Sequence, residues 1–428
     1  MMSHSRFSPG NSYRILFIVI CCLALGAGTM RTSTAHAALV SSTTIYVNTA
    51  QDELNVDGDC SLREAVRAAN SDTQVDACPA GSGVDTIILP AGTYTLTIAG
   101  ANEDLALAGD LDITNSLTII GMGIQLTQID GNHIDRILDV FAPAVLQLYQ
   151  LSLINGSAPA TGLYGGGAIL NRSSGTLDLN QISLRENSSQ SVGGAIDNSG
   201  TARLNYVTLD ANLASSEESM YVAGGAVYNG GSLMVYNSLF YNNTASNPEN
   251  IDYGGGLFND NTATLLNVTF SHNSADWGGG IFHNGVEANL YNVTFTENTT
   301  AIHAAFPLRI KNSIVSSSTA GVNCNGSGTI TSLGHNIDSG SSCNFDMEGI
   351  DPLLGPLADN QGAVFTHALL LSSPAIDTGD NTDCPATDQR GALRPADGNG
   401  DTIRVCDIGA YEYQAFFPFI IYLPILRK

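Results

Sequence analysis

A glycine-rich segment near the C-terminus carries side-chain oxygens at the spacing of a calcium loop. Asp397, Asn399 and Asp401 alternate with glycines, so each side chain can turn toward one ion while the backbone curves around it. The glutamate that an EF-hand needs at its twelfth place is absent, because that place holds Ile408. The segment therefore predicts either a calcium site formed by Asp397, Asn399 and Asp401 or an ordinary turn, and no other cofactor is expected.

The cysteines are the second group with distinctive chemistry. Two of the eight, Cys21 and Cys22, lie in an N-terminal leader, and the other six fall into three local couples. We predict that these couples form disulfides, since export permits oxidation, and that each closes a loop worth roughly 3 kcal/mol. A zinc site is the rival interpretation, but no C-x-x-C or H-x-x-x-H spacing supports it. The predicted pairs are Cys60–Cys78, Cys324–Cys343 and Cys384–Cys406.

Groups for acid–base catalysis are present but do not form a pattern. Hydrolysis of a polysaccharide needs two carboxylates at a defined separation, and the acids of the central region do not recur in register. A calcium-dependent lyase needs a basic group beside an acidic cluster, and no such cluster accompanies the central arginines. We therefore predict no catalytic residue. The acids considered are Asp178, Asp197, Asp210 and Asp276, and the bases are Arg172, Arg185 and Arg203.

The overall charge excludes some classes of partner. The 428 residues include 16 Lys and Arg against 40 Asp and Glu, a formal charge of −24. Only two lysines occur, Lys311 and Lys428, so neither a nucleic acid nor an anionic membrane surface is an expected partner. The chain is 43% hydrophobic and can bury a large core, so its acidity does not indicate disorder.

The first 37 residues have the features of a secretory leader. Arg6 and Arg14 precede an apolar run over residues 15–28, and Ala35-His36-Ala37 matches a small-x-small cleavage site. We predict cleavage after Ala37 and a secreted bacterial protein, with an uncleaved anchor as the alternative. At the other end, the apolar tail of residues 414–428 is too short to span a bilayer, so no transmembrane span is predicted in the mature chain.

Two interleaved repeats occupy the middle of the chain. The first is an alternating apolar strand, and its copies end 31, 25, 31, 30, 25 and 20 residues apart. The second begins with Gly-Gly and ends with Asn or His. The strand copies run over residues 148–153, 179–184, 204–209, 235–240, 265–270, 290–295 and 310–315, and the glycine motifs begin at Gly166, Gly193, Gly224, Gly254 and Gly278.

A period of this size with short strands predicts a right-handed parallel β-helix, the fold of pectin lyases. Leucine-rich repeats and propellers fit the spacing worse. The glycine pair allows a tight corner between sheets. One asparagine follows each strand copy at a fixed place, where its amide can bond to backbone groups of neighbouring coils as a ladder. These asparagines include Asn187, Asn212, Asn243, Asn273 and Asn298.

A short helix is expected before the first coil. Ser61 followed by Glu64 is a capping box, and Leu62, Val66 and Ala69 form one apolar face at helical spacing. An open end of a β-helix exposes unpaired strand edges, so we predict that this helix caps the N-terminal end. An ordinary surface helix is the alternative.

Segments at both ends resemble known domains. Residues 60–65, Cys-Ser-Leu-Arg-Glu-Ala, resemble the CSLREA domain of exported bacterial β-helix proteins. The motifs at 351–357, 373–377, 388–391 and 406–412 resemble the choice-of-anchor Q domain, which precedes surface-sorting tails. The resemblance implies an exported, surface-associated protein, but it implies no common reaction.

Together these patterns predict an all-β chain with five parts. They are a signal peptide (1–37), an N-terminal cap (38–84), a right-handed parallel β-helix (85–318), a disulfide-bearing, β-rich C-terminal domain (319–413) and an apolar tail (414–428). We expect a structural, adhesive or carbohydrate-contacting protein at the cell surface, retained through its C-terminal region. A polysaccharide lyase or hydrolase with a groove along one sheet is the alternative.

Overall fold

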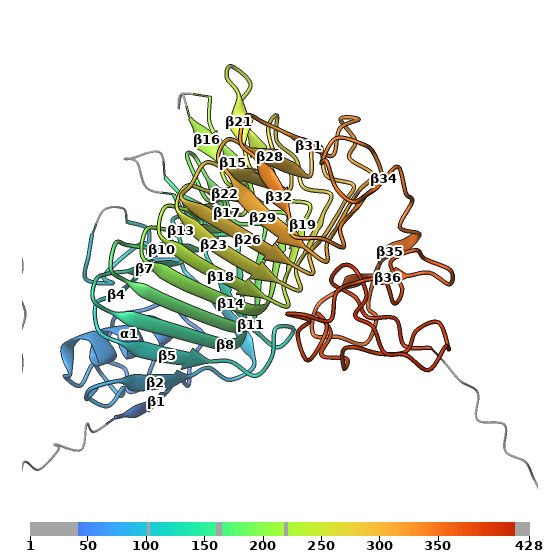
Figure 1. The fold of residues 1–428 in the computed structure, drawn as a ribbon. Coiled ribbons are helices and arrows are strands. Elements are labelled where there is room, and N and C mark those ends of the chain that lie inside the picture. Colours follow the sequence, from blue (N-terminus) through green and yellow to red (C-terminus); the bar gives the residue numbers. More distant parts are fainter. Residues whose placement is uncertain (1–41, 101–102, 160–164, 218–220, 416–428) are drawn as a thin grey trace, which may run out of the picture. The chain divides into compact units, whose positions relative to one another are not determined.

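The computed structural model describes residues 42–100, 103–159, 165–217 and 221–415. Within these residues the chain is a right-handed parallel β-helix, with one α-helix between its first two strands and a C-terminal region of few strands after it (Figure 1). The leader and residues 416–428 lie outside the described residues, so the cleavage site and the sorting of the tail stay predictions.

One wall of the β-helix is a nine-stranded parallel sheet with one short strand from each coil. The five strands that belong to the second repeat each follow its glycine corner, and the first glycine of each copy has φ between +60° and +76°, a conformation that favours glycine. The strands are β4 Leu111–Ile113, β7 Leu138–Val140, β10 Ile169–Asn171, β13 Ile196–Asn198, β17 Val227–Asn229, β22 Leu257–Asn259, β25 Ile281–His283, β28 Ile302–Ala304 and β31 Cys324–Asn325.

The remaining walls form a network of nineteen strands in two ladders, which share the long strands β8, β11 and β14. Strands of the first repeat build both ladders. The nineteen strands are β1 Thr44–Tyr46, β2 Asp85–Ile88, β3 Gly92–Thr95, β5 Leu117–Ile120, β6 Thr127–Asp130, β8 Val145–Ile154, β11 Thr176–Arg185, β14 Thr201–Asp210, β18 Ser232–Tyr236, β19 Leu239–Tyr241, β23 Thr262–Leu266, β24 Thr269–Ser271, β26 Glu287–Tyr291, β27 Thr294–Thr296, β29 Leu308–Lys311, β30 Ile314–Ser316, β32 Ile330–Ser332, β33 Ile337–Asp338 and β34 Met347–Glu348.

A corner separates the two ladders, and one residue per coil occupies it with φ between +48° and +56°. Asparagine tolerates this left-handed conformation better than most residues, which explains its recurrence before the end of the strand motif. We call this row the corner row. Its members are Gln150, Gln181, Tyr206, Asn237, Asn267, Asn292 and Asn312.

Short strands outside these walls pair the loops of successive coils. They form one four-stranded and one two-stranded parallel sheet. The strands are β9 Ser157–Ala158, β12 Ser188–Ser189, β15 Leu213–Ser215 and β20 Thr244–Ser246, then β16 Val222–Ala223 and β21 Asp252–Tyr253.

The interior is a stack of like residues. Phe270 lies between Phe240 and Phe295, with ring centroids 4.4 and 4.9 Å apart. The predicted asparagine ladder is confirmed, because each buried amide donates to the side-chain oxygen of the next at 2.9–3.0 Å and also to a backbone carbonyl. It runs through Asn187, Asn212, Asn243, Asn273 and Asn298.

The predicted helix is α1, Leu62–Ser71, and it begins with the predicted capping box of Ser61 and Glu64. It lies at the edge of the nine-stranded sheet. Asn70 donates to the Asp112 carbonyl of β4 at 2.6 Å, and Arg63 donates to the carbonyls of Gly109 and Asp110. The helix therefore satisfies backbone groups that the first coil would otherwise expose.

The parallel ladder is longer than the predicted range of 85–318. It starts with β1, which precedes the helix and pairs with β2, and it continues through β34. The later strands have two or three residues and polar sequences, so the repeat patterns do not mark them. Disulfides join Cys60 to Cys78, Cys324 to Cys343 and Cys384 to Cys406, the three couples that the sequence favours.

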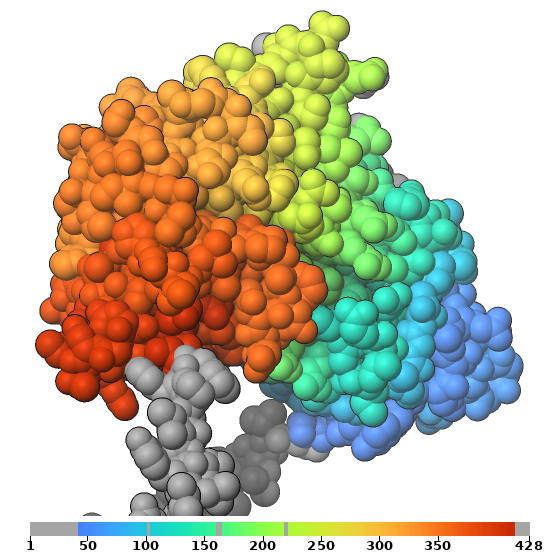
Figure 2. Space-filling model, turned by 90° about the vertical axis from the view of Figure 1, so that its right-hand side faces the viewer, coloured from blue at the N-terminus to red at the C-terminus, as the bar shows by residue number. Residues whose placement is uncertain are grey.

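The C-terminal region, residues 349–415, contains the antiparallel hairpin of β35 Leu354–Ala358 and β36 Thr366–Leu369 and is otherwise mostly loops. It lies against one side of the coils (Figures 1 and 2). Asn267 and Asn312 of the corner row donate to the carbonyls of Thr387 and Asp380 at 2.8 and 2.9 Å. Buried Gln389 donates to the Ser238 carbonyl at 3.1 Å, so the motif at 388–391 docks this region.

Candidate functional site

The nine-stranded sheet carries one outward row of side chains with chemical character. Side chains alternate along a strand, so the central residue of each three-residue strand points away from the interior. These central residues are aligned in register from coil to coil. The members from the first coils are mostly acidic, and most of those from later coils are aromatic. Its members are Asp112, Asp139, Leu170, Asp197, Tyr228, Phe258, Phe282, His303 and Asn325.

The acidic end holds three carboxylates close together. Asp110, Asp112 and Asp139 each place one oxygen within 4.8 Å of the others, and all three residues are buried. Arg136 pairs with Asp110 at 2.9 Å, and Arg172 pairs with Asp139 at 2.7 Å. The sequence prediction that no acidic cluster accompanies Arg172 is therefore wrong, because Asp112 and Asp139 are 27 positions apart and only the coil register brings them together.

Burial alters the ionisation of these acids. Burial, with the neighbouring carboxylates, raises the pKa of Asp110 to about 8 and that of Asp112 to about 7. Acids of this kind can donate protons at neutral pH. They are shielded, however, since Asp112 is fully buried and accepts a hydrogen bond from the Ala106 amide of the overlying loop. In this conformation the cluster fixes that loop and has no open face for a substrate.

The aromatic end is a continuous stack of rings. The centroid separations are 5.3 Å for Tyr228 and Phe258, 5.1 Å for Phe258 and Phe282, and 4.7 Å for Phe282 and His303, with near-parallel planes. Burial lowers the pKa of His303, so its ring is neutral at neutral pH and stacks without a charge.

A second layer of rings comes from the adjoining loops. Trp277 stacks on His303 at 4.8 Å with an interplanar angle of 4°, and Tyr253 meets Trp277 edge to face. Tyr221 packs beside Tyr253 at 5.6 Å. Trp277 is 40% exposed and Tyr221 is 39% exposed, so this layer presents ring surface to solvent. We call the seven rings the aromatic row: Tyr221, Tyr228, Tyr253, Phe258, Trp277, Phe282 and His303.

Polar groups border the aromatic row. The Tyr228 hydroxyl lies 3.3 Å from Asp260, whose other oxygen accepts from Asn284 at 2.7 Å. Buried Asp252 accepts from the backbone amide of Asp276 at 2.7 Å and so holds the loop that carries Trp277. Flat apolar surface with hydrogen-bonding groups at its edge is the usual make-up of a site for an amphipathic ligand.

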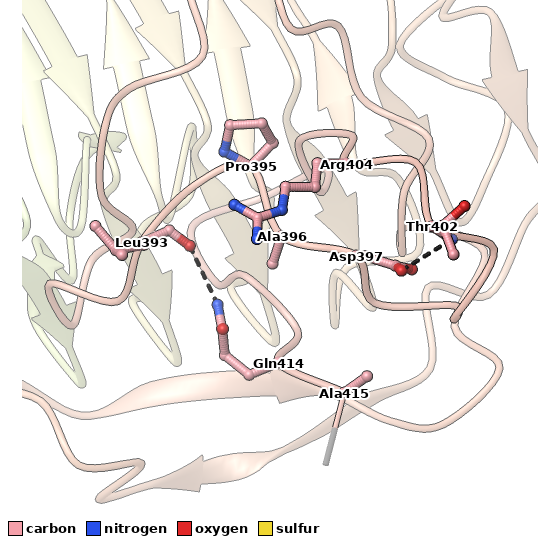
Figure 3. Close-up of a pocket in the computed structure, with 8 residues that line it drawn as sticks. All are labelled: Leu393, Pro395, Ala396, Asp397, Thr402, Arg404, Gln414 and Ala415. Atoms are coloured by element: carbon pink, nitrogen blue, oxygen red, sulfur yellow. Dashed lines mark hydrogen bonds between the residues drawn. The ribbon is translucent and has the colours of Figure 1, made fainter. Parts of the chain in front are cut away.

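The predicted calcium loop lies in the C-terminal region beside a cavity of about 440 Å³ (Figure 3). Its side-chain oxygens accept backbone hydrogen bonds within the loop. Asp397 accepts from the amides of Gly400 and Thr402, Asn399 from Asp401, and Asp401 from Ile403, at 2.7–2.9 Å. The loop therefore closes on its own amides, and calcium at Asp397, Asn399 and Asp401 stays a prediction.

The other predicted acids and bases are dispersed. Asp178 lies in β11, Asp276 beside Trp277, and Arg203 over the ring of Tyr236. Arg185 and Asp210 meet in a groove of about 330 Å³ between the coils and the C-terminal hairpin. Burial raises the pKa of Asp210 there, but the groove holds no second acid from the predicted set.

One arrangement looks like a hydrolytic triad and is not accessible as one. The Ser271 hydroxyl lies 2.9 Å from Nδ1 of His272, whose Nε2 lies 3.2 Å from Glu297. Ser271 is fully buried, and Nε2 of His367 lies 3.0 Å from the same hydroxyl. Because the hydroxyl has no exposed face, we assign it to docking the hairpin, which carries His367.

Comparison with protein families gives one match, a repeat of the Chlamydia polymorphic membrane protein type, at residues 267–284. These residues include Phe270 at the end of one strand copy, the ladder residue Asn273 and the glycine motif that begins at Gly278. No curated protein and no solved structure matches the chain. None of the helices among the described residues is long and apolar enough to cross a membrane.

Proposed function

We propose that this chain is an exported bacterial surface protein that binds carbohydrate along the aromatic row. The observation that carries the proposal is the exposed ring surface of Trp277 and Tyr221 above a regular stack of rings, one from each of four successive coils. Sugar rings have apolar C–H faces and a polar rim, which match an aromatic surface bordered by Asp260 and Asn284.

The repetition of the row favours a polymer over a small ligand. Phe258, Phe282 and His303 of the stack are buried and follow the strand spacing, so they form a regular base for the exposed rings of Trp277 and Tyr221. The exposed layer is also continuous, because Trp277 and Tyr221 both contact Tyr253. A chain of sugars can use several such contacts at once, and their affinities combine.

Support for the location comes from three separate features. Residues 1–37 have the features of an export signal, residues 267–284 are similar to a repeat of Chlamydia polymorphic membrane proteins, and two motifs resemble domains of surface-associated proteins. Retention at the surface through the C-terminal region belongs to the same proposal, with residues 416–428 as the sorting element.

Binding of residues 38–428 to a glycan array and to cell-envelope polysaccharides tests the proposal. We expect Trp277→Ala to weaken binding by about fivefold, because a stacked aromatic contact is worth about 1 kcal/mol. Tyr46→Ala is the matched control, since Tyr46 is exposed on β1 outside the row. Absence of binding to every glycan, or equal binding by both variants, would overturn the proposal.

An enzyme remains the second candidate because of the acidic end of the same sheet. The pKa values of Asp110 and Asp112 suit proton transfer near neutral pH, and their cluster lies on the sheet that carries the aromatic row. Catalysis there requires the overlying loop at Ala106 to open, because the cluster is covered in this conformation. Incubating the protein with uronic-acid and neutral polysaccharides, with and without calcium, tests this role. Products that disappear in Asp110→Asn would establish catalysis, and their absence from all substrates would leave binding as the function.

A further inference from the structure

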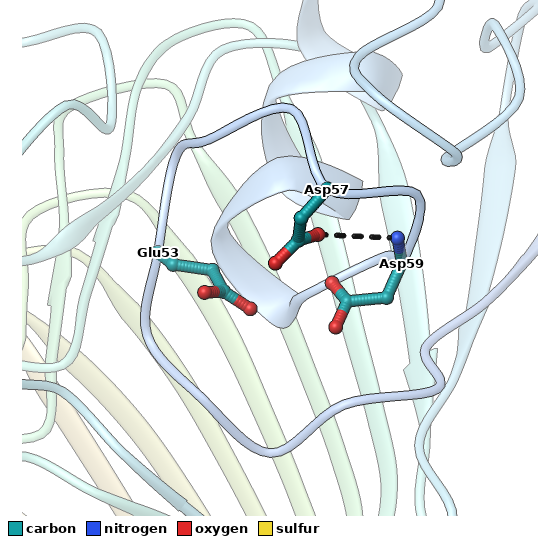
Figure 4. Close-up of side chains that lie close together, drawn as sticks. All are labelled: Glu53, Asp57 and Asp59. Atoms are coloured by element: carbon teal, nitrogen blue, oxygen red, sulfur yellow. Dashed lines mark hydrogen bonds between the residues drawn. The ribbon is translucent and has the colours of Figure 1, made fainter.

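Five carboxylates converge in the N-terminal cap, outside the site described above. Glu53, Asp57 and Asp59 come from the loop before α1 and lie close together (Figure 4). Asp59 also lies close to Glu64 of the first helical turn and to Asp76 of the loop after the helix. In each of these two groups, one oxygen from each residue lies within 4.8 Å of the others.

Local hydrogen bonds hold several of these acids by one oxygen only. Glu64 accepts the Ser61 amide at 3.0 Å with Oε2, as the capping box requires. Asp76 accepts the amides of Asp57 and Gly58 with Oδ2 at 3.2 and 2.8 Å. The loop and the helix are thereby held in place without use of the second oxygens.

Three of the remaining oxygens are buried and have no hydrogen-bond partner. They are Oε1 of Glu53, Oδ1 of Asp59 and Oε1 of Glu64. Glu64 is a fully buried residue, with 0% exposure. A buried carboxylate oxygen without a partner is costly, so a group that supplies positive charge at this point would be stabilising.

The protein supplies no such charge from its own described side chains. Among residues 42–100, 103–159, 165–217 and 221–415, none of the five acids forms an ion pair, and the nearby Arg63 pairs with Asp52 instead.

We propose that Glu53, Asp57, Asp59, Glu64 and Asp76 bind a divalent cation, with calcium preferred over magnesium. Calcium accepts six to eight oxygen ligands in flexible geometry, which suits carboxylates from three separate segments. Magnesium needs near-octahedral ligands and keeps several waters, so it fits a cluster of this kind less well.

The cation would link the two loops of the cap to each other and to helix α1. The Cys60–Cys78 disulfide brings the loop carrying Asp76 beside the loop carrying Asp59, and the Ala77 amide donates to the Asp59 carbonyl at 3.2 Å. Binding at this point links both loops to the helix that covers the edge of the nine-stranded sheet. Calcium therefore stabilises the N-terminal end of the β-helix.

Calorimetric titration of metal-free residues 38–428 with calcium chloride and with magnesium chloride tests the proposal. We expect saturable calcium binding below about 1 mM, and weaker magnesium binding. Glu64→Gln and Asp59→Asn should each weaken calcium binding roughly tenfold or more, because each removes one ligand charge. Glutamine at position 64 keeps the capping box, so the helix is expected to fold, and circular dichroism checks this.

Glu249→Gln is the matched control, since it neutralises one exposed acid outside both candidate calcium sites and leaves the cap intact. It should leave the strongest calcium isotherm unchanged. The proposal is overturned if the wild-type chain binds no calcium up to about 10 mM, a limit above the range of extracellular calcium modules. It is also overturned if a folded Glu64→Gln protein binds calcium as the wild type does.

Discussion

The N-terminal cap and the C-terminal region both bury acidic side chains, but they balance the charge differently. In the C-terminal region the fully buried Arg394 and Glu412 pair at 2.8 Å, and Arg390 pairs with Asp388 at 2.7 Å. The second oxygen of Glu412 accepts the Ala396 amide. In the cap, buried oxygens of Glu53, Asp59 and Glu64 have no partner at all.

In the C-terminal region the chain's own arginines compensate the buried acids, whereas in the cap we propose that a bound cation does so. Only 16 basic residues are present, and two of them lie within the C-terminal region beside its buried acids. A buried pair removes the need for a metal at that place, since the carboxylate is already compensated.

The largest effect is expected from Arg394→Ala in the C-terminal region. The change leaves Glu412 buried without its partner and should lower the free energy of unfolding by about 3–5 kcal/mol. Guanidinium unfolding and amide hydrogen exchange over residues 380–415 measure the loss. Arg404→Ala is the control, because Arg404 is exposed and should change stability by less than about 0.5 kcal/mol. If both variants have the same free energy of unfolding, the Arg394–Glu412 ion pair contributes nothing to stability.

Removing one disulfide at a time should distinguish the two regions by the effect on calcium binding. Replacing Cys60 and Cys78 with alanine should cost roughly 3 kcal/mol and also weaken calcium binding. Replacing Cys384 and Cys406 should cost a similar amount and leave calcium binding as it is. Thermal unfolding and calorimetric titration of both double variants give the two readouts. A cap variant that keeps full calcium affinity would contradict the prediction.

The two regions should respond to pH in opposite directions. Burial and nearby Glu412 raise the pKa of Asp407 from 3.8 to about 8, so the folded state keeps a proton that the unfolded state has lost. This contribution to stability is full below about pH 4 and disappears as the pH rises to 8, by at most about 1.4 kcal/mol per unit. Asp407→Asn should therefore flatten the fall in stability over that range.

Calcium binding in the cap should strengthen as the pH rises, because protons on Glu53 and Asp59 compete with the ion. Unfolding curves and calcium titrations at pH 5, 6.5 and 8 compare the two trends. Calcium affinity that is independent of pH would count against carboxylate ligands with raised pKa values.

The smallest effect is expected at the loop of residues 397–401. In a calcium-free buffer, Asp401→Asn should change the free energy of unfolding by no more than about 0.5 kcal/mol, since the asparagine oxygen still accepts the Ile403 amide. Denaturant unfolding measures this directly. A loss above 1 kcal/mol would mean that charge, and not only hydrogen bonding, holds the loop.

The sequence predicts features whose cause is local or periodic. The capping box of Ser61 and Glu64 depends on four adjacent residues, and the Asn187 ladder depends on a repeat visible in the chain. The three disulfides follow from cysteines that are close in sequence. Such features need no knowledge of how distant segments meet.

Contacts between residues that are distant in sequence depend on which strands pair and in what register, and the sequence alone does not show this pairing. Asp112 and Asp139 meet only because β4 and β7 pair, and their flanking residues match neither repeat. The aromatic row has a partial signal, since Tyr228, Phe258 and Phe282 share the fifth place of the glycine motif, but Trp277 and Tyr221 join it from loops. The Asn55-x-Asp57-x-Asp59 spacing in the cap resembles that of residues 397–401, and the sequence alone does not indicate Glu64 and Asp76 as partners.

The strict register of the nine-stranded sheet has a consequence for how this protein can evolve. Each coil contributes one outward residue, and each coil contacts mainly the coils directly before and after it. Duplication of the gene segment for one coil would thus add a single ring to the row and leave the geometry of the others unchanged. Related genes can lengthen or shorten the surface offered to a ligand in steps of one coil, without a new fold.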